Sequence, residues 1–288
     1  MTQGLKKTTK STAESLLGIQ GEARQPDGSG SELELLDVTK EFHARSGTVV
    51  ALKNVSLSIR RREFVALVGR SGCGKTTMLR ILAGLTHPSR GRVLAGGRPL
   101  WRDGGRDPET VGRLGIVFQD AHLFPWYSVE DNIALPLKLR GVGKKERLAR
   151  AHELCALVGL TGFERSYPRE LSGGMRQRVA IARALSYRPG VLLMDEPFGA
   201  LDALTREKMN LELQSLAAAS QSTVVLVTHS IREAVFLADR VVLLSPRPGR
   251  IRSITDVEFP RSRQLDVEAD PRFQEIVREL RRQLDEET

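Results

Sequence analysis

A glycine-rich segment of the chain has the residue types and spacing to bind phosphate. Residues 69–77 read Gly-Arg-Ser-Gly-Cys-Gly-Lys-Thr-Thr and lie between the apolar run 64–68 and a helical pattern. Glycines permit the positive φ angles that turn backbone N–H groups toward an anion, and a helix N-terminus adds partial positive charge. The spacing therefore predicts a nucleotide phosphate loop, in which Lys75 reaches the β- and γ-phosphates and the Thr76 hydroxyl binds Mg²⁺.

Two other apolar runs end in side chains that could act on a phosphate. Residues 191–194 lead into Asp195 and Glu196, and residues 223–228 lead into His229. Continuous apolar residues are typical of strands buried on both faces, and open α/β sheets bind ligands at the carboxyl ends of their strands. We expect Asp195 to hold Mg²⁺, Glu196 to act as general base for the attacking water, and His229 to contact the γ-phosphate. An isolated acidic pair is more often part of a solvated turn, but this pair ends an apolar strand downstream of a phosphate loop.

A second glycine-rich turn lies a hundred residues after the first. Residues 171–177 read Leu-Ser-Gly-Gly-Met-Arg-Gln and open a helical pattern. A Ser-Gly-Gly turn at a helix start is a second anion-type site, and it suits the ATP of a second copy because the chain already has one phosphate loop. A plain helix cap is the simpler alternative, but it gives no reason for two such helix starts.

In this order the segments resemble the ATPase subunits of ATP-binding cassette (ABC) transporters, over about residues 32–255. The resemblance implies an α/β fold: a P-loop NTPase (RecA-like) core with an antiparallel β subdomain and an inserted α-helical subdomain. It also implies ATP and Mg²⁺ as ligands, and two copies that pack head to tail as a homodimer with an ATP shared at each contact.

The resemblance assigns a role to each matching residue. The residues implied to bind ATP are Phe42, Gly69, Arg70, Ser71, Gly72, Cys73, Gly74, Lys75, Thr76 and Thr77. The implied catalytic residues are Gln119, Glu196 and His229, and the implied Mg²⁺ ligands are Thr76, Gln119 and Asp195. The signature residues implied to contact the second copy's ATP are Leu171, Ser172, Gly173, Gly174 and Gln177, and the D-loop aspartate is Asp202.

Two positions, Phe42 and Arg70, differ from the commonest pattern of such ATPases. Phe42 stands where many relatives carry Tyr, so it keeps the stacking ring and lacks the hydroxyl. Arg70 is not the commonest residue in its position, but the loop is built from backbone groups and should be unaffected. Cys73 is expected to fill space in the loop; a redox switch is the alternative.

Two segments resemble the nitrate/sulfonate/taurine importer group in particular. These are residues 118–126 and the run Ser-Pro-Arg-Pro-Gly-Arg-Ile within 243–251. The resemblance implies two integral membrane permease subunits, an extracytoplasmic solute-binding protein and a peripheral location at the cytoplasmic face of the plasma (inner) membrane. Phe124, Trp126 and Tyr127 either receive a helix of the membrane subunit or pack in the core of the helical subdomain.

The chain is expected to have three parts. Residues 1–30 are polar and have little to bury, which predicts a disordered leader. Residues 31–258 form the ATPase domain, with the helical subdomain at about 119–188. Residues 259–288 form a C-terminal helical extension, in which 271–284 has the apolar spacing of an amphipathic helix.

Composition excludes several other classes of protein. The 288 residues carry a net charge of +9, but the arginines are dispersed, so no nucleic-acid partner is expected. No apolar run approaches the roughly 18 residues of a membrane span, and two cysteines cannot build a disulfide framework. A non-transport cassette ATPase in DNA repair or translation is the alternative, although the chain has neither room for a long coiled-coil insertion nor a second cassette. A P-loop kinase would have no use for residues 171–177 or His229.

Overall fold

The computed structural model describes residues 30–286 apart from residues 46, 103–104 and 200. The predicted leader, 1–30, therefore lies outside the described residues except for its last position. The chain divides into two compact units, which are described separately below. The sheet unit comprises Pro26–Ile116, Gly190–Glu196 and Thr223–Thr288, and the helical unit comprises Val117–Pro189 and Pro197–Ser222.

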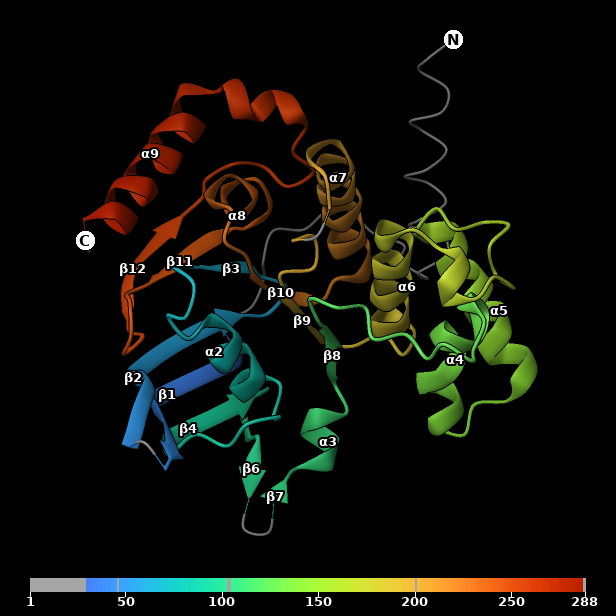
Figure 1. Cartoon of the computed structure of the whole chain (residues 1–288), viewed down its shortest axis with the longest axis horizontal. Helices are drawn as coiled ribbons and strands as arrows, with labels where there is room; N and C mark the ends of the chain where they lie inside the picture. The colour runs from blue at the N-terminus through green and yellow to red at the C-terminus, as the bar shows by residue number, and fades with distance from the viewer. Residues whose placement is uncertain (1–29, 46, 103–104, 200, 287–288) are drawn as a thin grey trace. The chain divides into compact units, whose positions relative to one another are not determined.

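A six-stranded sheet forms the centre of the sheet unit (Figure 1), with the strand order β12-β11-β3-β10-β9-β8. Its strands are β3 (Phe64–Val68), β8 (Leu114–Val117), β9 (Val191–Asp195), β10 (Thr223–Val227), β11 (Arg240–Leu244) and β12 (Ile251–Asp256). Strands β11, β3, β10 and β9 are parallel, and β12 is antiparallel to β11. Every residue of β3, β9 and β10 is buried, which confirms the prediction from their continuous apolar runs.

Two helices of the sheet unit pack on this sheet. Helix α2 (Lys75–Leu82) contacts β9 and β10, and α8 (Ile231–Leu237) contacts β3 and β11. Helix α2 buries Met78, Leu79 and Ile81 in the core that it shares with the strands. Because parallel strands end at the same edge, the segments that follow β3, β9 and β10 are brought together there.

The sheet unit also contains an antiparallel sheet of order β2-β1-β4-β5. Its strands are β1 (Ser31–Ala44), β2 (Gly47–Arg60), β4 (Arg90–Ala95) and β5 (Arg98–Pro99), followed by the small β6 (Trp101–Arg102) and β7 (Gly105–Arg106) pair and helix α3 (Pro108–Val111). This sheet confirms the antiparallel β subdomain that the resemblance implies. Register shifts between β1 and β2, with Asp37 and Asn54 at φ 49° and 50°, accommodate the polar residues without ending the ladder.

The helical unit consists mainly of α4 (Val129–Leu139), α5 (Lys144–Leu157), α6 (Gly173–Leu185) and α7 (Ala203–Ser220). Helices α4, α5 and α6 pack against one another (Figure 1). Helix α5 buries Ala151, Leu154 and Cys155, which follow one another at helical spacing. Side chains of Ser128, Ser172 and Asp202 cap the N-termini of α4, α6 and α7 respectively. A 3₁₀ turn, Pro168–Glu170, leads into α6.

The C-terminal segment folds back onto the sheet unit. A 3₁₀ turn (Leu265–Ala269) leads into α9 (Pro271–Asp285), which lies beside α8 (Figure 1). The predicted amphipathic helix is confirmed: Phe273, Val277 and Leu280 are buried at helical spacing. Within the described residues, no helix combines the length and apolar content that crossing a membrane requires.

Candidate nucleotide-binding site

The phosphate loop connects β3 to α2 and fits only glycine at two of its positions. A Cβ atom on Gly69 would lie 2.7 Å from Cys73 Sγ, and one on Gly74 would lie 2.7 Å from Leu52 Cδ2. Gly72 and Gly74 have φ angles of +77° and +107°, which side chains rarely tolerate. The close packing leaves the loop's backbone groups, rather than side chains, to line the cradle, as binding of a phosphate chain requires.

Lys75 lies at the first position of α2 and folds back over the loop. Its side chain is buried, and Nζ donates to the carbonyl oxygens of Gly69 at 2.6 Å and Arg70 at 3.0 Å. The N-cap of α2 is Gly74, so no side chain accepts from the first N–H groups of the helix. Lys75 and the helix N-terminus therefore place positive charge at the loop, where phosphate oxygens could accept from both.

The two residues predicted to hold Mg²⁺ within the sheet unit are in contact. Thr76 Oγ1 donates to Asp195 Oδ1 at 3.1 Å, across the gap between α2 and the end of β9. Burial raises the pKa of Asp195, and the hydrogen bond from Thr76 opposes that effect. Within the described part of the chain, no group of three His, Cys, Asp or Glu side chains could hold a metal. One hydroxyl and one carboxylate instead suit Mg²⁺ that arrives with a nucleotide, whose phosphates supply further oxygen ligands.

Glu196 and His229 meet at the ends of neighbouring strands. His229 Nδ1 lies 3.1 Å from Glu196 Oε2, and the backbone N–H of Glu196 donates to Val227 at 2.9 Å. Glu196 adopts a φ of +44°, an uncommon conformation for a residue other than glycine, which turns the chain sharply after β9. The His229 side chain is 57% exposed and that of Glu196 is 23% exposed, so both could reach a bound ligand.

A loop that the sequence marked only by resemblance supports the phosphate loop. Gly249 is paired with β2, because its N–H donates to Ala51 at 2.9 Å and its carbonyl accepts from Lys53 at 3.0 Å. Arg247 Nη2 donates to the Gly72 carbonyl at 3.3 Å. The run Ser-Pro-Arg-Pro-Gly at 245–249 does not by itself reveal this contact, because nothing in the run indicates that it packs against the phosphate loop.

The remaining ATP-binding predictions in the sheet unit stay predictions. Phe42 is 45% exposed in β1, opposite Val49 of β2, with Lys40 Nζ 4.9 Å from its ring centroid. An exposed ring on a hairpin could stack on adenine. Cys73 is buried within the loop, as a residue that fills space would be. Ser71 is exposed and Thr77 is half-buried.

The other predicted site residues belong to the helical unit. Gln119 is exposed after β8, and Asp202 caps α7 through its contact with the Thr205 N–H at 3.0 Å. In the signature, Ser172 and Gly173 are exposed, Gly174 is half-buried and Leu171 is buried. Gln177 is also buried, and its side-chain amide donates to the Phe118 carbonyl at 3.0 Å. The signature helix is thereby tied to the residue that precedes Gln119.

The aromatic residues after Gln119 form an exposed cluster. Trp126 is 66% exposed and Phe124 is 37% exposed, with their ring centroids 5.6 Å apart. Tyr127 is half-buried and completes the cluster, 5.9 Å from Phe124. The exposure of Phe124 and Trp126 contradicts the alternative that these two residues are buried core.

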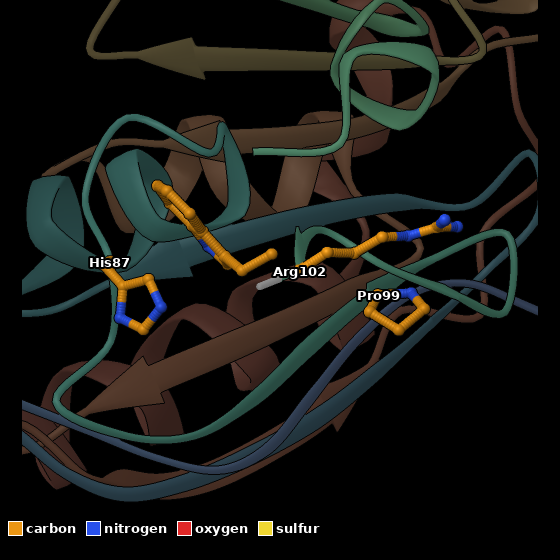
Figure 2. Close-up of a pocket in the computed structure, with 4 residues that line it drawn as sticks. His87, Pro99 and Arg102 are labelled. Carbon is orange, nitrogen blue, oxygen red and sulfur yellow. The ribbon is translucent and has the colours of Figure 1, made fainter. Parts of the chain in front are cut away.

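A separate hollow of about 540 Å³ lies in the antiparallel part of the sheet unit (Figure 2). It is lined by His87, Pro99, Trp101 and Arg102, and the His87 and Trp101 rings meet edge to face at 4.7 Å. None of these residues belongs to the phosphate loop or to the strand ends that carry Asp195 and His229. The hollow is therefore separate from the candidate nucleotide site.

The phosphate loop follows the parallel strand β3, and the acidic residues Asp195 and Glu196 stand at the end of β9, two strands away in the sheet. This arrangement defines a P-loop NTPase. Comparison with known families narrows this class: residues 52–199 match the family described as ABC transporter. The chain belongs to the ABC transporter family and is an ATPase.

Individual relatives cover most of the chain. The nitrate import ATP-binding protein NrtD of Synechocystis is 46% identical over 84% of this chain and 90% of its own length. The taurine import ATP-binding protein TauB of Burkholderia thailandensis is also 46% identical, over 87% of this chain and 96% of its own length. Among solved structures, the cassette MJ0796, a dimer in a post-hydrolysis state with ADP and Pi, matches 79% of this chain and all of its own. Its TM-score is 0.70 at 36% identity.

Proposed function

We propose that this chain is the ATP-hydrolysing subunit of an importer for a small solute such as nitrate, a sulfonate or taurine. The observation that carries the proposal is the Glu196–His229 pair, held beside a complete phosphate loop within one unit. The names of the relatives support import, since both NrtD and TauB are import ATP-binding proteins. They favour import over the alternative of DNA repair or translation.

The phosphate loop would hold the nucleotide through its backbone N–H groups. Lys75 would exchange its carbonyl partners for oxygens of the β- and γ-phosphates and neutralise their charge. Thr76 and Asp195 would hold Mg²⁺, which when bound neutralises further charge on the phosphates. Phe42 would stack on the adenine.

Glu196 and His229 would carry the hydrolysis step. Glu196 would accept a proton from a water molecule while the oxygen of that water attacks the γ-phosphorus. The bond between the γ-phosphorus and the β,γ-bridging oxygen breaks at the same time, and ADP leaves. With its proton on Nδ1, His229 donates to Glu196 and keeps Nε2 as an acceptor. His229 would thus orient the carboxylate toward the water.

Two copies would share each ATP. Ser172 and Gly173 are exposed at the start of α6, where N–H groups and the helix dipole favour an anion. The similar cassette MJ0796 forms a dimer with ADP and Pi, which supports a homodimer for this chain. Each signature would then meet the γ-phosphate held by the partner's phosphate loop.

The exposed aromatic cluster gives the helical unit a surface for a membrane subunit. Phe124 and Trp126 expose apolar area of the kind found at the centres of protein interfaces. We place two integral permease subunits against this cluster on the two copies, and an extracytoplasmic solute-binding protein beyond the membrane. The chain would then be peripheral, at the cytoplasmic face of the plasma (inner) membrane.

Deletion of the gene tests the proposal. Growth would be measured on single sources of sulfur or nitrogen: taurine, alkanesulfonates, sulfate, nitrate and ammonium. We expect growth to fail on one source and to be restored by the wild-type gene but not by Glu196→Gln. In parallel, the purified protein should hydrolyse ATP with Mg²⁺, and Lys75→Ala should lose ATP binding. Normal growth on every source, with no co-purifying permease, would contradict the import function.

A further inference from the structure

A buried arginine links the C-terminal extension to the end of helix α8. Arg263 is 5% exposed, and its Nη1 donates to the carbonyls of Val235, Phe236 and Ala238 at 2.8, 3.0 and 2.9 Å. Its Nη2 donates to Phe259 at 3.1 Å. Cations are favoured at a helix C-terminus, where backbone carbonyls have no partner within the helix. Arg263 therefore closes the last turn of α8 from outside that helix.

Arg263 stays positively charged in its buried position, although the hydrogen-bond partners described for it are backbone carbonyls and not carboxylates. Burial lowers its pKa to about 10, so the guanidinium remains protonated at neutral pH. A planar guanidinium spreads five N–H donors over three nitrogens and so reaches carbonyls on both α8 and residues 257–260, whereas an ammonium group presents three donors from a single point. The site thus requires the shape of Arg as well as its charge.

The extension also holds the other end of α8. Arg232, the second residue of α8, pairs with Glu268 at 3.1 Å and contacts Gln274 of α9 at 3.5 Å. The apolar face of α9 covers α8 between these points, with Phe273 fully buried. A helix of only seven residues has little stability of its own, so these contacts, together with its packing on β3 and β11, fix its position.

Helix α8 in turn fixes the turn that carries His229. Ser230 caps α8 by accepting from the Glu233 N–H at 3.3 Å, and Thr228 donates to the buried Glu233 carboxylate. His229 lies between these two anchored residues and reaches Glu196. A shift of α8 would therefore move the imidazole.

We propose that the C-terminal extension positions His229 for catalysis, and that Arg263 is the positioning residue through which it holds α8. The inference rests on the role proposed for His229 in the preceding section. The sequence predicted only a helical extension without a function; the inference assigns that extension a part in ATP hydrolysis.

The test compares Arg263→Ala and Arg263→Lys with the wild-type protein by steady-state kinetics, fluorescent-ATP binding and hydrogen exchange. Because small displacements of catalytic groups lower rates steeply, we expect kcat to fall by about tenfold or more in Arg263→Ala. Lys should restore little of the rate, since one ammonium nitrogen cannot reach the carbonyls of both α8 and residues 257–260 as the guanidinium fork does. The Kd for ATP should stay within about twofold, because the phosphate loop is untouched. Amide exchange should rise in residues 227–237.

Matched variants separate this role from general destabilisation. Arg278→Ala removes an exposed arginine of α9 that pairs with Glu275, and should leave kcat unchanged. If Arg263 variants do not fold, Arg232→Glu should lower kcat and the double change with Glu268→Arg should restore it. Wild-type kcat in Arg263→Ala, or in Arg232→Glu, would overturn the inference. If His229→Ala instead hydrolyses ATP with the wild-type kcat, the proposed role of His229 is overturned. The two failures are therefore distinguishable.

Discussion

The backbone at Glu196 is the least ordinary feature of the site at the scale of single residues. A φ of +44° in a residue with a long side chain costs about 1–3 kcal/mol, and such a conformation persists only where surrounding contacts hold it. Here the hydrogen bond from the Glu196 N–H to Val227 supplies such a contact, and the side chain reaches His229. The strained turn aims the carboxylate at the edge where the phosphate loop ends.

Replacing Glu196 by Gln tests its role as general base. The amide keeps the size of the side chain and an oxygen that can accept from His229, so ATP binding should be unchanged. Hydrolysis should fall by about 10²–10⁴-fold, the usual contribution of a positioned base. Single-turnover hydrolysis and fluorescent-ATP binding would measure the two effects separately. Turnover at the wild-type rate would remove Glu196 from the reaction.

Gly249 gives a second test at this scale. A Cβ atom there would lie 2.1 Å from the Cys73 carbonyl oxygen and would push the 245–250 loop off the phosphate loop. We expect Gly249→Ala to weaken ATP binding about tenfold and to destabilise the fold by about 1–3 kcal/mol, as overpacking does. Gly143→Ala, at a position with nothing within 4 Å of the added atom, is the control. Equal ATP affinity in both variants would show that the loop does not support the nucleotide site.

The residues that the sequence revealed are those whose chemistry demands a fixed type and spacing. Lys75, Thr76 and Asp195 could be found because a phosphate loop and an acidic strand end have their own signatures. Gly249 and Arg263 could not, because each is defined by contacts with segments distant in the sequence. Buried arginines and close glycines carry no local signal of what they touch.

At the scale of elements, burial determined which predictions were correct. Strands β3, β9 and β10 were predictable because both faces are covered and the apolar run is continuous. Strand β2 is half-exposed and carries polar residues, and its pairing with β1 includes shifts of register. The register depends on the partner strand, which the local sequence does not contain.

Arg178 joins helix α6 to α7, which allows a test of how the signature is held. Arg178 donates to Glu212 at 2.9 Å and to the Val158 carbonyl at 3.1 Å. Burial raises the pKa of Glu212, so its carboxylate depends on this partner. We expect Arg178→Ala to cost about 1–2 kcal/mol, and the double change with Glu212→Gln to cost less than Arg178→Ala alone.

Urea unfolding at several pH values would measure this coupling. A carboxyl whose pKa is raised in the folded state favours folding as the pH falls, because protonation removes the cost of burying its charge. The deficit of Arg178→Ala should therefore be largest at neutral pH and shrink toward about pH 5. Strictly additive effects of the two changes, independent of pH, would show that the pair does not couple α6 to α7.

At the scale of the whole molecule, the predicted site residues are divided between the two units. The sheet unit supplies the phosphate loop, Asp195, Glu196 and His229, whereas the signature turn belongs to the helical unit. Ser172 and Gly173 are exposed on that unit and available to another molecule. The dimeric cassette MJ0796 shows that a chain of this family can pair in the presence of nucleotide.

Replacing Ser172 by Arg tests whether the signature meets the second copy. In the Glu196→Gln background, ATP should convert the parent protein into a dimer, observed as a doubled mass by light scattering. With Ser172→Arg added, the large charged side chain would fill the space at the start of α6, so the mass should stay that of a monomer. ATP affinity of the monomer should remain within about twofold, because the phosphate loop lies in the sheet unit.

Two controls isolate the steric effect on pairing. Ser172 accepts from the Met175 N–H at 3.3 Å, so Ser172→Ala removes the cap without adding bulk and should cost about 1 kcal/mol while leaving the dimer. Thr161→Arg adds the same side chain at another exposed position of the helical unit, and the protein that carries it should still form the ATP-dependent dimer. A dimer that forms in Ser172→Arg as readily as in Thr161→Arg would place the signature away from the second nucleotide. The spare anion site at α6 would then be an ordinary helix cap.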